Sequence, residues 1–281
     1  MNVITLVHRR ATQLANLIAG LEQSTVPVAA LWVVWMNEAP SSLHSERFAI
    51  HALRVDGKNG ALPLARARNA IRGRNEAQPW VFLDVDCIPS PGLLRGYREA
   101  LRAHPQALHL GEVRYLPPSA NDPGWTAQSL HAASVAHPLS VFRSETGQPM
   151  PHHLFWSLNF ACAGEVFERI GGFDDGYLGY GGEDTDFAFR ARERGVELRS
   201  ADALAYHQYH PTYRPPLNHF AAIVANARRF HARWNEWPMS DWLGGFAERG
   251  LIDWRDDELE VLRQPSAAEI AACFNEARTG F

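Results

Sequence analysis

The acidic motif Asp84-Val85-Asp86 follows directly on the apolar run 80–83, and its residue types suit metal chemistry. Carboxylates on alternate positions of an extended segment point to the same side, so Asp84 and Asp86 can share one divalent cation. Mg²⁺ and Mn²⁺ prefer oxygen ligands and commonly bridge substrate phosphates. The motif therefore predicts a metal site that holds a diphosphate. Two solvated acids in a turn are the competing interpretation.

A second acidic motif, Gly181-Gly182-Glu183-Asp184, opens a helix-like segment far downstream. Adjacent carboxylates on a helix project in different directions, so Glu183 and Asp184 can serve different partners, one of them as a base. The segment 174–182 before them is rich in Gly and Tyr, which is typical of a loop that closes over a substrate. The competing interpretation is an ordinary helix start, where acids are favoured in the first turn.

Histidines and arginines supply further candidates for the same chemistry. A neutral imidazole of His207, or less favourably His210, could complete the ligand shell of a Mn²⁺ ion. A diphosphate at a sheet edge also needs cationic donors. The basic candidates are Arg9, Arg10, Arg66 and Arg68.

Composition narrows the class of protein. The chain has 281 residues, of which 46% are hydrophobic, and this is enough for one large α/β domain or two small ones. Its formal net charge of −4 gives no global attraction to nucleic acid. The cysteines Cys87, Cys162 and Cys273 are widely spaced and odd in number, which indicates a reducing compartment. We expect a cytoplasmic protein with no targeting segment, and peripheral membrane contact stays open.

The elements that must position these residues alternate between strands and helices. Buried or alternating apolar runs predict strands, and apolar residues at helical spacing predict helices between them. Such alternation is typical of a mostly parallel sheet whose ligands lie beyond the carboxyl ends of the strands. We expect strands over residues 3–7, 30–36, 48–55, 80–83, 108–116, 155–163 and 197–205. We expect helices over residues 12–21, 62–74, 91–103, 164–170 and 183–194, and one within 121–136.

The chain changes character near Pro215-Pro216. Residues 144–153 before this point contain Pro and Gly and predict a loop. After it the pattern is helical, over residues 218–234, 241–249 and 266–277. The sequence therefore predicts an α/β domain over residues 1–212, followed by a helical extension over residues 213–281 that packs on it.

Four segments together resemble a known family. Residues 170–190 carry Ile-Gly-Gly-Phe-Asp-Asp and Gly-Tyr-Gly-Gly-Glu-Asp-Thr-Asp-Phe, ending at Arg190, which resembles the C-terminal signature of β-1,4-galactosyltransferase-like enzymes. The signature is also similar to that of bacterial family 2 glycosyltransferases, including chondroitin-polymerase-type domains. Residues 205–208 resemble the metal-histidine segment of the latter, residues 64–69 their Ala-Arg-Asn helix, and residues 83–86 their metal motif. The order and spacing of the four agree over roughly residues 1–212.

This resemblance implies a GT-A fold, in which a Rossmann-like, mostly parallel sheet is flanked by helices. It implies an inverting hexosyltransferase that uses Mn²⁺ or Mg²⁺ and a UDP-sugar such as UDP-Gal or UDP-GalNAc. The acceptor would be a hydroxyl of a glycan or glycolipid. Asp184 would be the base and Glu183 would hold the acceptor. Tyr180, Gly181 and Gly182 would form the sugar loop, and Tyr180 stands where the galactosyltransferases have a tryptophan. The metal would fall at Asp84, Asp86 and His207, and the donor nucleotide at Arg9, Arg10, Asn37, Asp56, Arg66, Asp84, Val85 and Asp86.

The sequence departs from the family at two places that bear on the donor. Many relatives end the second strand with Asp, whereas Met36-Asn37 stands here and Asp56 would substitute. The loop after the first strand reads His8-Arg9-Arg10 rather than the commoner Asn-Arg. The base and sugar preferences therefore stay open.

Three other classes compete with this interpretation. A HAD-type phosphatase shares the run 82–86 but needs a lysine after it, and the only lysine, Lys58, precedes it. A nucleotidyltransferase usually carries a Gly-rich, Lys-containing loop after its first strand, which is missing here. A catalytically silent sugar- or nucleotide-binding domain would not need the intact acidic set.

Overall fold

A mixed β-sheet forms the centre of the chain in the computed structural model, which describes residues 1–74 and 78–276. In the described part the sheet has ten strands, eight of them in the order β3-β2-β1-β4-β9-β6-β10-β5. The pairs β7 (Val135–Ala136) on β6 and β8 (Pro149–Met150) on β10 extend it locally. The bounds of the eight are β1 (Asn2–Val7), β2 (Ala30–Met36), β3 (Ala49–Val55), β4 (Trp80–Leu83), β5 (Cys87–Pro89), β6 (Leu108–Tyr115), β9 (Asn159–Cys162) and β10 (Leu198–His207).

Strand directions bring the carboxyl ends of six strands to one edge. β1, β2, β3 and β4 pair in parallel, and so do β6 and β10. β9 lies antiparallel between β4 and β6, so the two parallel groups point the same way. The predicted mostly parallel α/β sheet is confirmed, and the ends of the strands that carry Asp84, Tyr115 and His207 share one edge.

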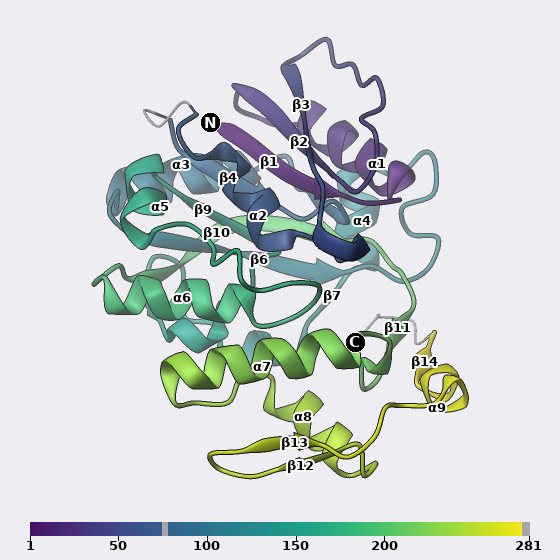
Figure 1. The fold of residues 1–281 in the computed structure, drawn as a ribbon. Helices are drawn as coiled ribbons and strands as arrows, with labels where there is room; N and C mark the ends of the chain where they lie inside the picture. Colours follow the sequence, from purple (N-terminus) through teal and green to yellow (C-terminus); the bar gives the residue numbers. More distant parts are fainter. Residues whose placement is uncertain (75–77, 277–281) are drawn as a thin grey trace.

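Helices cover both faces because strand side chains alternate. In β4, Val81 and Leu83 face a core with α1 (Ala11–Glu22) and α3 (Leu93–Ala103). Trp80 and Phe82 face a second core, with α2 (Leu64–Arg68), α5 (Gly164–Ile170) and α6 (Glu183–Glu193). The two cores make a three-layer arrangement that supports the edge where the strands end (Figure 1).

Several predicted elements are shorter in the structure. The helix expected over residues 62–74 is α2 followed by the 3₁₀ turn η2 (Asn69–Ile71). α2 ends at Asn69, which is its C-cap. The Asn69 side chain donates to the carbonyl of Phe173 and accepts from its N–H. The strand expected over 155–163 is only β9, and the helix within 121–136 is α4 (Ala127–Ala133). The expected loop 144–153 contains β8 and part of the turn η4 (His152–Leu154).

The C-terminal part is helical as expected, with additional small sheets. It has η5 (Leu217–His219), α7 (Phe220–Trp234), α8 (Ser240–Ala247) and α9 (Ala267–Ala272). The helix predicted over 266–277 is α9, and Ala277 lies outside the described residues. The hairpin β12 (Ile252–Trp254)–β13 (Leu259–Val261) and the pair β11 (Thr212–Tyr213)–β14 (Phe274–Asn275) were not predicted. Among the described helices, none is long and apolar enough to cross a membrane.

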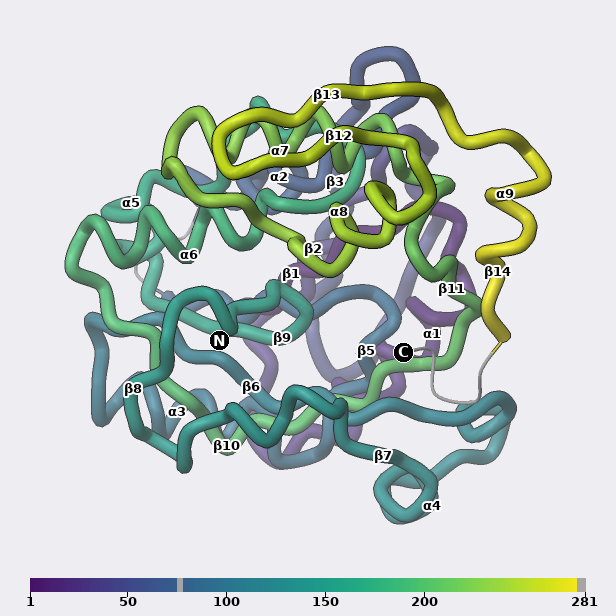
Figure 2. The backbone as a smooth tube through the Cα atoms, turned by 90° about the horizontal axis from the view of Figure 1, so that it is seen from below, coloured from purple at the N-terminus to yellow at the C-terminus, as the bar shows by residue number. Residues whose placement is uncertain are grey.

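Helix α7 of the C-terminal part lies beside α6 of the α/β layers, as Figure 1 shows, and packs against it. Phe189 of α6 packs edge-on against Phe230 and Trp234 of α7, with ring centroids 5.2 and 5.5 Å apart. The indole Nε1 of Trp234 donates to Oδ1 of the fully buried Asp186 at 2.9 Å. Figure 2 shows the hairpin β12–β13 and α8 on the same side as α7, away from α4 and β7.

Loss of the indole donor should destabilise the chain, because Asp186 is buried and depends on it. We expect Trp234→Phe to lower the free energy of unfolding by about 1–3 kcal/mol, as measured by urea denaturation. Trp237→Phe is the matched control, since the Trp237 indole donates to the carbonyl of Asp256 at an exposed position. Equal losses in both variants would show that the bond to Asp186 does not connect the two parts.

Candidate functional site

The pairing of β5 with β10 brings Asp86 and His207 together. The two strands are antiparallel, with Cys87 opposite His207, and the N–H of Gln208 donates to the carbonyl of Asp86 at 2.6 Å. The buried Gln208 side chain also accepts from Asn16 at 2.8 Å. This pairing fixes the backbone of the acidic motif against the end of β10.

The acidic motif forms a tight turn instead of the extended segment that we expected. The N–H of Cys87 donates to the carbonyl of Asp84 at 2.9 Å, which closes the turn between β4 and β5. The turn sends the two carboxylates to different partners. Asp86 faces two histidines, whereas Asp84 faces Arg68.

Asp86, His207 and His210 form a cluster whose donor set suits a divalent metal. One ligand atom from each lies within 4.8 Å of the others. The Nε2 atoms of His207 and His210 lie 3.6 and 3.4 Å from the Asp86 carboxylate. Its Oδ1 atom is buried without a hydrogen-bond partner, which is costly unless a cation takes it. One carboxylate and two imidazoles are ligands that Mn²⁺ accepts, so these residues fit the expected ion.

The pKa shifts in the cluster favour the metal-binding forms of Asp86 and His207 but the protonated form of His210. Burial would raise the pKa of Asp86, but the neighbouring His207 and His210 outweigh it and hold that pKa well below its usual range. Burial lowers the pKa of His207 despite the adjacent carboxylate, which favours the neutral imidazole that binds metals. The hydrogen bond with Asp86 raises the pKa of His210.

Arg68 joins the two acidic motifs. Its guanidinium is buried, and it donates to Glu183 at 3.1 Å and to Asp84 at 3.4 Å. Burial raises the pKa of Asp84 to about 7, against the effect of Arg68 and with that of Asp86 and Glu183. The α2 helix thus supplies the cation that lets carboxylates from β4 and α6 lie close together.

Asp184 is the carboxylate best placed to act as a base. It lies in the first turn of α6, and its Oδ1 accepts from the N–H of Thr185 at 2.8 Å. Burial and the adjacent Glu183 raise the pKa of Asp184 to about 6, against the effects of Arg68 and a backbone hydrogen bond from Ser157. A carboxylate with such a pKa is ionised at neutral pH and still basic enough to take a proton.

The loop before α6 is held by the C-terminal part. The buried Asn226 of α7 donates to the carbonyls of Leu178, Tyr180 and Gly181 at 3.1, 3.3 and 2.8 Å. Its Oδ1 atom accepts from the N–H of Leu178 at 3.4 Å. One amide side chain therefore sets the path of the loop that leads to Glu183.

Aromatic contacts reinforce this hold on the loop. Tyr180 stacks on His219 with ring centroids 4.6 Å apart and on Trp242 at 5.6 Å. Burial raises the pKa of the Tyr180 hydroxyl, and the carboxylates of Glu183 and Asp184 add to the rise. Tyr180 therefore connects the C-terminal part with the acidic residues.

Some predicted donor-binding residues lie near the metal cluster and others do not. Arg10, at the end of β1, is close enough to lower the pKa of Asp86 electrostatically. Arg9 is exposed, has a positive φ of 54°, and its N–H donates to Glu38 at 3.0 Å. The Val85 side chain is buried in the core beneath the turn, so its backbone is the part that remains for a ligand.

The remaining donor candidates organise the loop after β3. Asn37 accepts from the N–H of Gly57 at 2.6 Å and donates to the carbonyls of Gly60 and Ala61. Asp56 is half-exposed and pairs with Arg54 at 3.0 Å, while Arg66 donates to its carbonyl oxygen. These residues are grouped at the ends of β2 and β3, on the same sheet edge as the acidic motif.

Sequence reasoning missed several residues that shape the site. Asn226 and Trp242 lie in the segment for which no motif was recognised, and their role depends on tertiary contacts. Tyr115 ends β6, and its ring lies 4.8 Å from that of His207. Its position at a strand's carboxyl end was the one available signal.

Comparisons with known proteins agree with the predicted resemblance. Residues 137–214 match a family model described as the N-terminal domain of galactosyltransferase. Validoxylamine A glucosyltransferase of Streptomyces hygroscopicus subsp. jinggangensis is 39% identical over 49 residues, which cover 17% of this chain and 12% of that protein. Chondroitin synthase of Escherichia coli is 27% identical over 154 residues, covering 46% of this chain and 22% of that protein. The matches thus span less than a quarter of each of these two relatives.

Solved structures share the fold across most of the chain. S. aureus TarS 1–349 in complex with UDP-GlcNAc superposes with a TM-score of 0.57, at 12% identity, over 89% of this chain and 71% of that one. GalNAc-T7 with UDP, GalNAc and Mn²⁺ gives 0.51, at 14% identity, over 74% and 44%. The predicted GT-A type of fold and the resemblance to glycosyltransferases are confirmed.

The bonds from Asn226 lead to a measurable expectation for the loop. Asn226→Leu removes the donor to three carbonyls, so we expect the amide protons of residues 178–182 to exchange with solvent at least about tenfold faster. Hydrogen exchange followed by mass spectrometry measures this directly. Asn218→Leu, at an exposed position before α7, is the control. Unchanged exchange in Asn226→Leu would mean that the aromatic contacts hold the loop without it.

Proposed function

We propose that this chain is a metal-dependent, inverting glycosyltransferase that moves a hexose from a UDP-sugar to a hydroxyl of a glycan or glycolipid. The observation that carries the proposal is that one edge of the sheet holds two separate groups of residues with different chemistry. Asp86, His207 and His210 form a cluster suited to a cation, while Asp184 is a separate carboxylate with a pKa of about 6. A diphosphate leaving group and a hydroxyl nucleophile need these two groups.

A cation at this site would be Mn²⁺ or Mg²⁺, held by Asp86, His207 and His210. Mn²⁺ suits the imidazole ligands better. When bound, the ion neutralises the charge of the nucleoside diphosphate that departs. Asp84 was predicted as a further ligand, and in the structure its carboxylate is paired with Arg68 at 3.4 Å.

Asp184 performs the proton transfer in this proposal. Its carboxylate takes the proton of the acceptor hydroxyl, the hydroxyl oxygen bonds to the anomeric carbon, and the bond from that carbon to the diphosphate oxygen breaks. Attack from the face opposite the leaving group inverts the configuration. Glu183 lies beside the base and holds acceptor hydroxyls, while the ion pair with Arg68 holds Glu183 in place.

The donor is proposed to be a UDP-sugar because structures with this fold contain such a molecule or its parts. TarS 1–349 was solved in complex with UDP-GlcNAc, and GalNAc-T7 with UDP, GalNAc and Mn²⁺. UDP-Gal and UDP-GalNAc remain our candidates for this chain, given the match to the galactosyltransferase model. Arg10, next to the metal cluster, is the basic residue best placed to contact the diphosphate.

We propose that residues 1–212 form the catalytic domain and that residues 213–281 form an extension that orders its loop. The bonds from Asn226 and the stacking on Tyr180 support this arrangement. The three cysteines are free and buried, which agrees with a cytoplasmic place of action.

Nucleotide binding that depends on the metal tests the donor side. We expect UDP with Mn²⁺ to raise the melting temperature, because a ligand at about 100 times its Kd stabilises the native state by about 2.7 kcal/mol. UDP without Mn²⁺, or with Asp86→Asn, should give little shift. Asp257→Asn, at an exposed position of the β12–β13 hairpin, should behave as the parent chain. A shift that is the same with and without Mn²⁺ would remove the metal from the proposal.

The pH dependence of transfer tests the base. Because burial raises the pKa of Asp184 to about 6, the ionised and active form should be lost as pH falls through 6. We expect kcat/KM for transfer to rise about tenfold per pH unit below pH 6 and to level off above it. Asp184→Asn should lower transfer by about 10²- to 10⁴-fold while Mn²⁺-dependent UDP binding persists. Full activity in Asp184→Asn would assign the base to another residue.

A further inference from the structure

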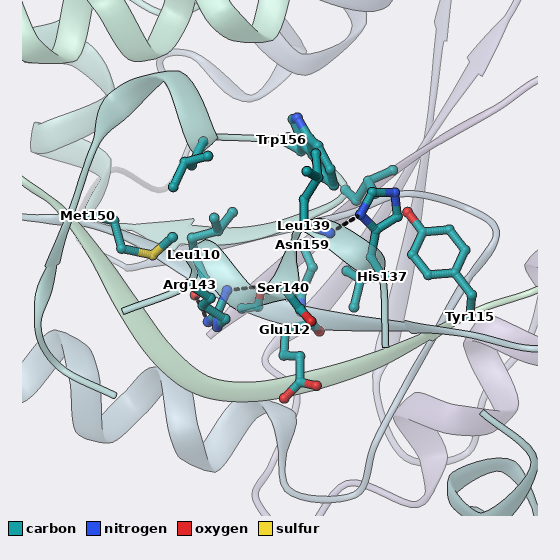
Figure 3. A pocket seen from close by; sticks show the side chains of 14 residues that line it. Leu110, Glu112, Tyr115, His137, Leu139, Ser140, Arg143, Met150, Trp156 and Asn159 are labelled. Atoms are coloured by element: carbon teal, nitrogen blue, oxygen red, sulfur yellow. Dashed lines mark hydrogen bonds between the residues drawn. The ribbon is translucent and has the colours of Figure 1, made fainter. Parts of the chain in front are cut away.

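A small apolar pocket lies against β6, next to the candidate site but separate from its charged residues. It has a volume of about 80 Å³ and lies between the β6–β9 part of the sheet and the covering segment 137–158. Most of its exposed wall is apolar. In Figure 3, Tyr115 and His137 lie at one end and Met150 at the other, with Leu110 and Leu139 between them.

Two strongly polar side chains of this pocket, Arg143 and Asn159, are engaged in the fold. Arg143 donates to the carbonyls of Leu110, Gly111 and Ala201 at 2.5, 3.0 and 3.0 Å. Asn159 accepts from the Tyr97 hydroxyl at 2.7 Å and donates to the carbonyls of Glu112 and Ala203. These groups hold the wall together, so the surface left for a ligand is mainly apolar. A bare sugar ring, with hydroxyls on every side, would lose hydrogen bonds there.

An aromatic row runs from the pocket to the candidate metal cluster. The Tyr115 ring lies 4.8 Å from His207 and 5.4 Å from His137. The His137 ring in turn meets Trp156 edge-on at 4.9 Å. Tyr115 therefore lines the pocket and also contacts His207 of the cluster.

The covering segment carries apolar side chains outward as well. Leu139 lines the pocket and is 43% exposed, and Val141 and Phe142, next to it in the turn η3 (Pro138–Phe142), are 78% and 60% exposed. Exposed large apolar side chains so close together mark a binding surface more often than chance. They extend the apolar lining beyond the pocket, away from the reaction centre.

We infer that this pocket binds an apolar alkyl or aryl aglycone of the acceptor, whose sugar hydroxyl reaches the acidic residues past Tyr115. The inference rests on the proposed function and specifies its acceptor as amphiphilic. The aromatic row positions the first sugar, and the aliphatic wall from Leu139 to Met150 takes the first carbons of the aglycone. Because each buried methylene strengthens binding by about fourfold, even a short chain should be distinguished from a methyl group.

The test compares n-butyl β-D-galactopyranoside with methyl β-D-galactopyranoside on the full chain, by saturation-transfer NMR and by titration. The butyl compound should bind at least about tenfold tighter, and its chain protons should receive the strongest saturation. Leu139→Glu should abolish the preference, because it puts a charge into the wall at a position exposed enough to keep the fold. Val141→Glu is the matched control, two residues further on and outside the lining, and it should keep the preference.

Three outcomes would overturn the inference. They are equal affinity for both glycosides, no saturation of the butyl protons at millimolar concentration, and an equal loss of preference in Val141→Glu and Leu139→Glu. Melting temperatures of both variants check their folding, and Leu139→Ser replaces Leu139→Glu if the latter unfolds. Mn²⁺-dependent UDP binding is measured on the same samples. A chain that binds UDP with Mn²⁺ but not the butyl group refutes only the acceptor inference, and the reverse result refutes only the proposed donor chemistry.

Discussion

The buried guanidinium of Arg68 is the interaction on which the candidate site depends. It lies between Asp84 and Glu183, at 3.4 and 3.1 Å, with Asp184 also within its electrostatic reach. Carboxylates so close together and so buried would otherwise repel one another and take up protons. Removing a buried partner of this kind leaves uncompensated charge, which costs far more than a surface ion pair. Arg68 therefore lets carboxylates after β4 and at the start of α6 lie close together.

Strand direction decides which residues can join this arrangement. Because β4, β6 and β10 all end at the same edge, their following residues meet there whatever their separation in sequence. The antiparallel β5 adds the return of the chain, and its register against β10 sets Asp86 beside His207. The position of the cluster is thus a consequence of backbone pairing. The types of the side chains at these positions then decide whether the cluster can bind a cation.

The edge could be predicted from the sequence, but the orientation of its side chains could not. The apolar run 80–83 and the acidic residues after it identify a strand and its end, and His207 likewise marks the end of β10. The sequence does not reveal that Asp84 closes a turn onto Cys87, which sends the two carboxylates to different partners. It also does not reveal Arg68 as their common partner rather than a surface residue. The first is a local turn that the apolar pattern does not report. The second depends on contacts between residues 16 and 115 positions apart in the sequence, which local patterns do not report.

The sequence predicted the helices of the C-terminal part. It did not predict that they contact the loop before α6. The C-terminal part's own core around Phe220, Leu243 and Phe246 would suffice for a separate appendage. Yet Gly181 adopts a φ of 94°, and a Cβ there would lie 2.6 Å from the Met239 sulfur. Glycine is thus favoured by the turn, and the Met239 side chain just before α8 packs closely against it. The loop 174–182 and the C-terminal extension pack against each other, so each limits which residues the other can carry. A substitution in the loop or in the extension should therefore shift the position of Asp184, since α6 begins where the loop ends.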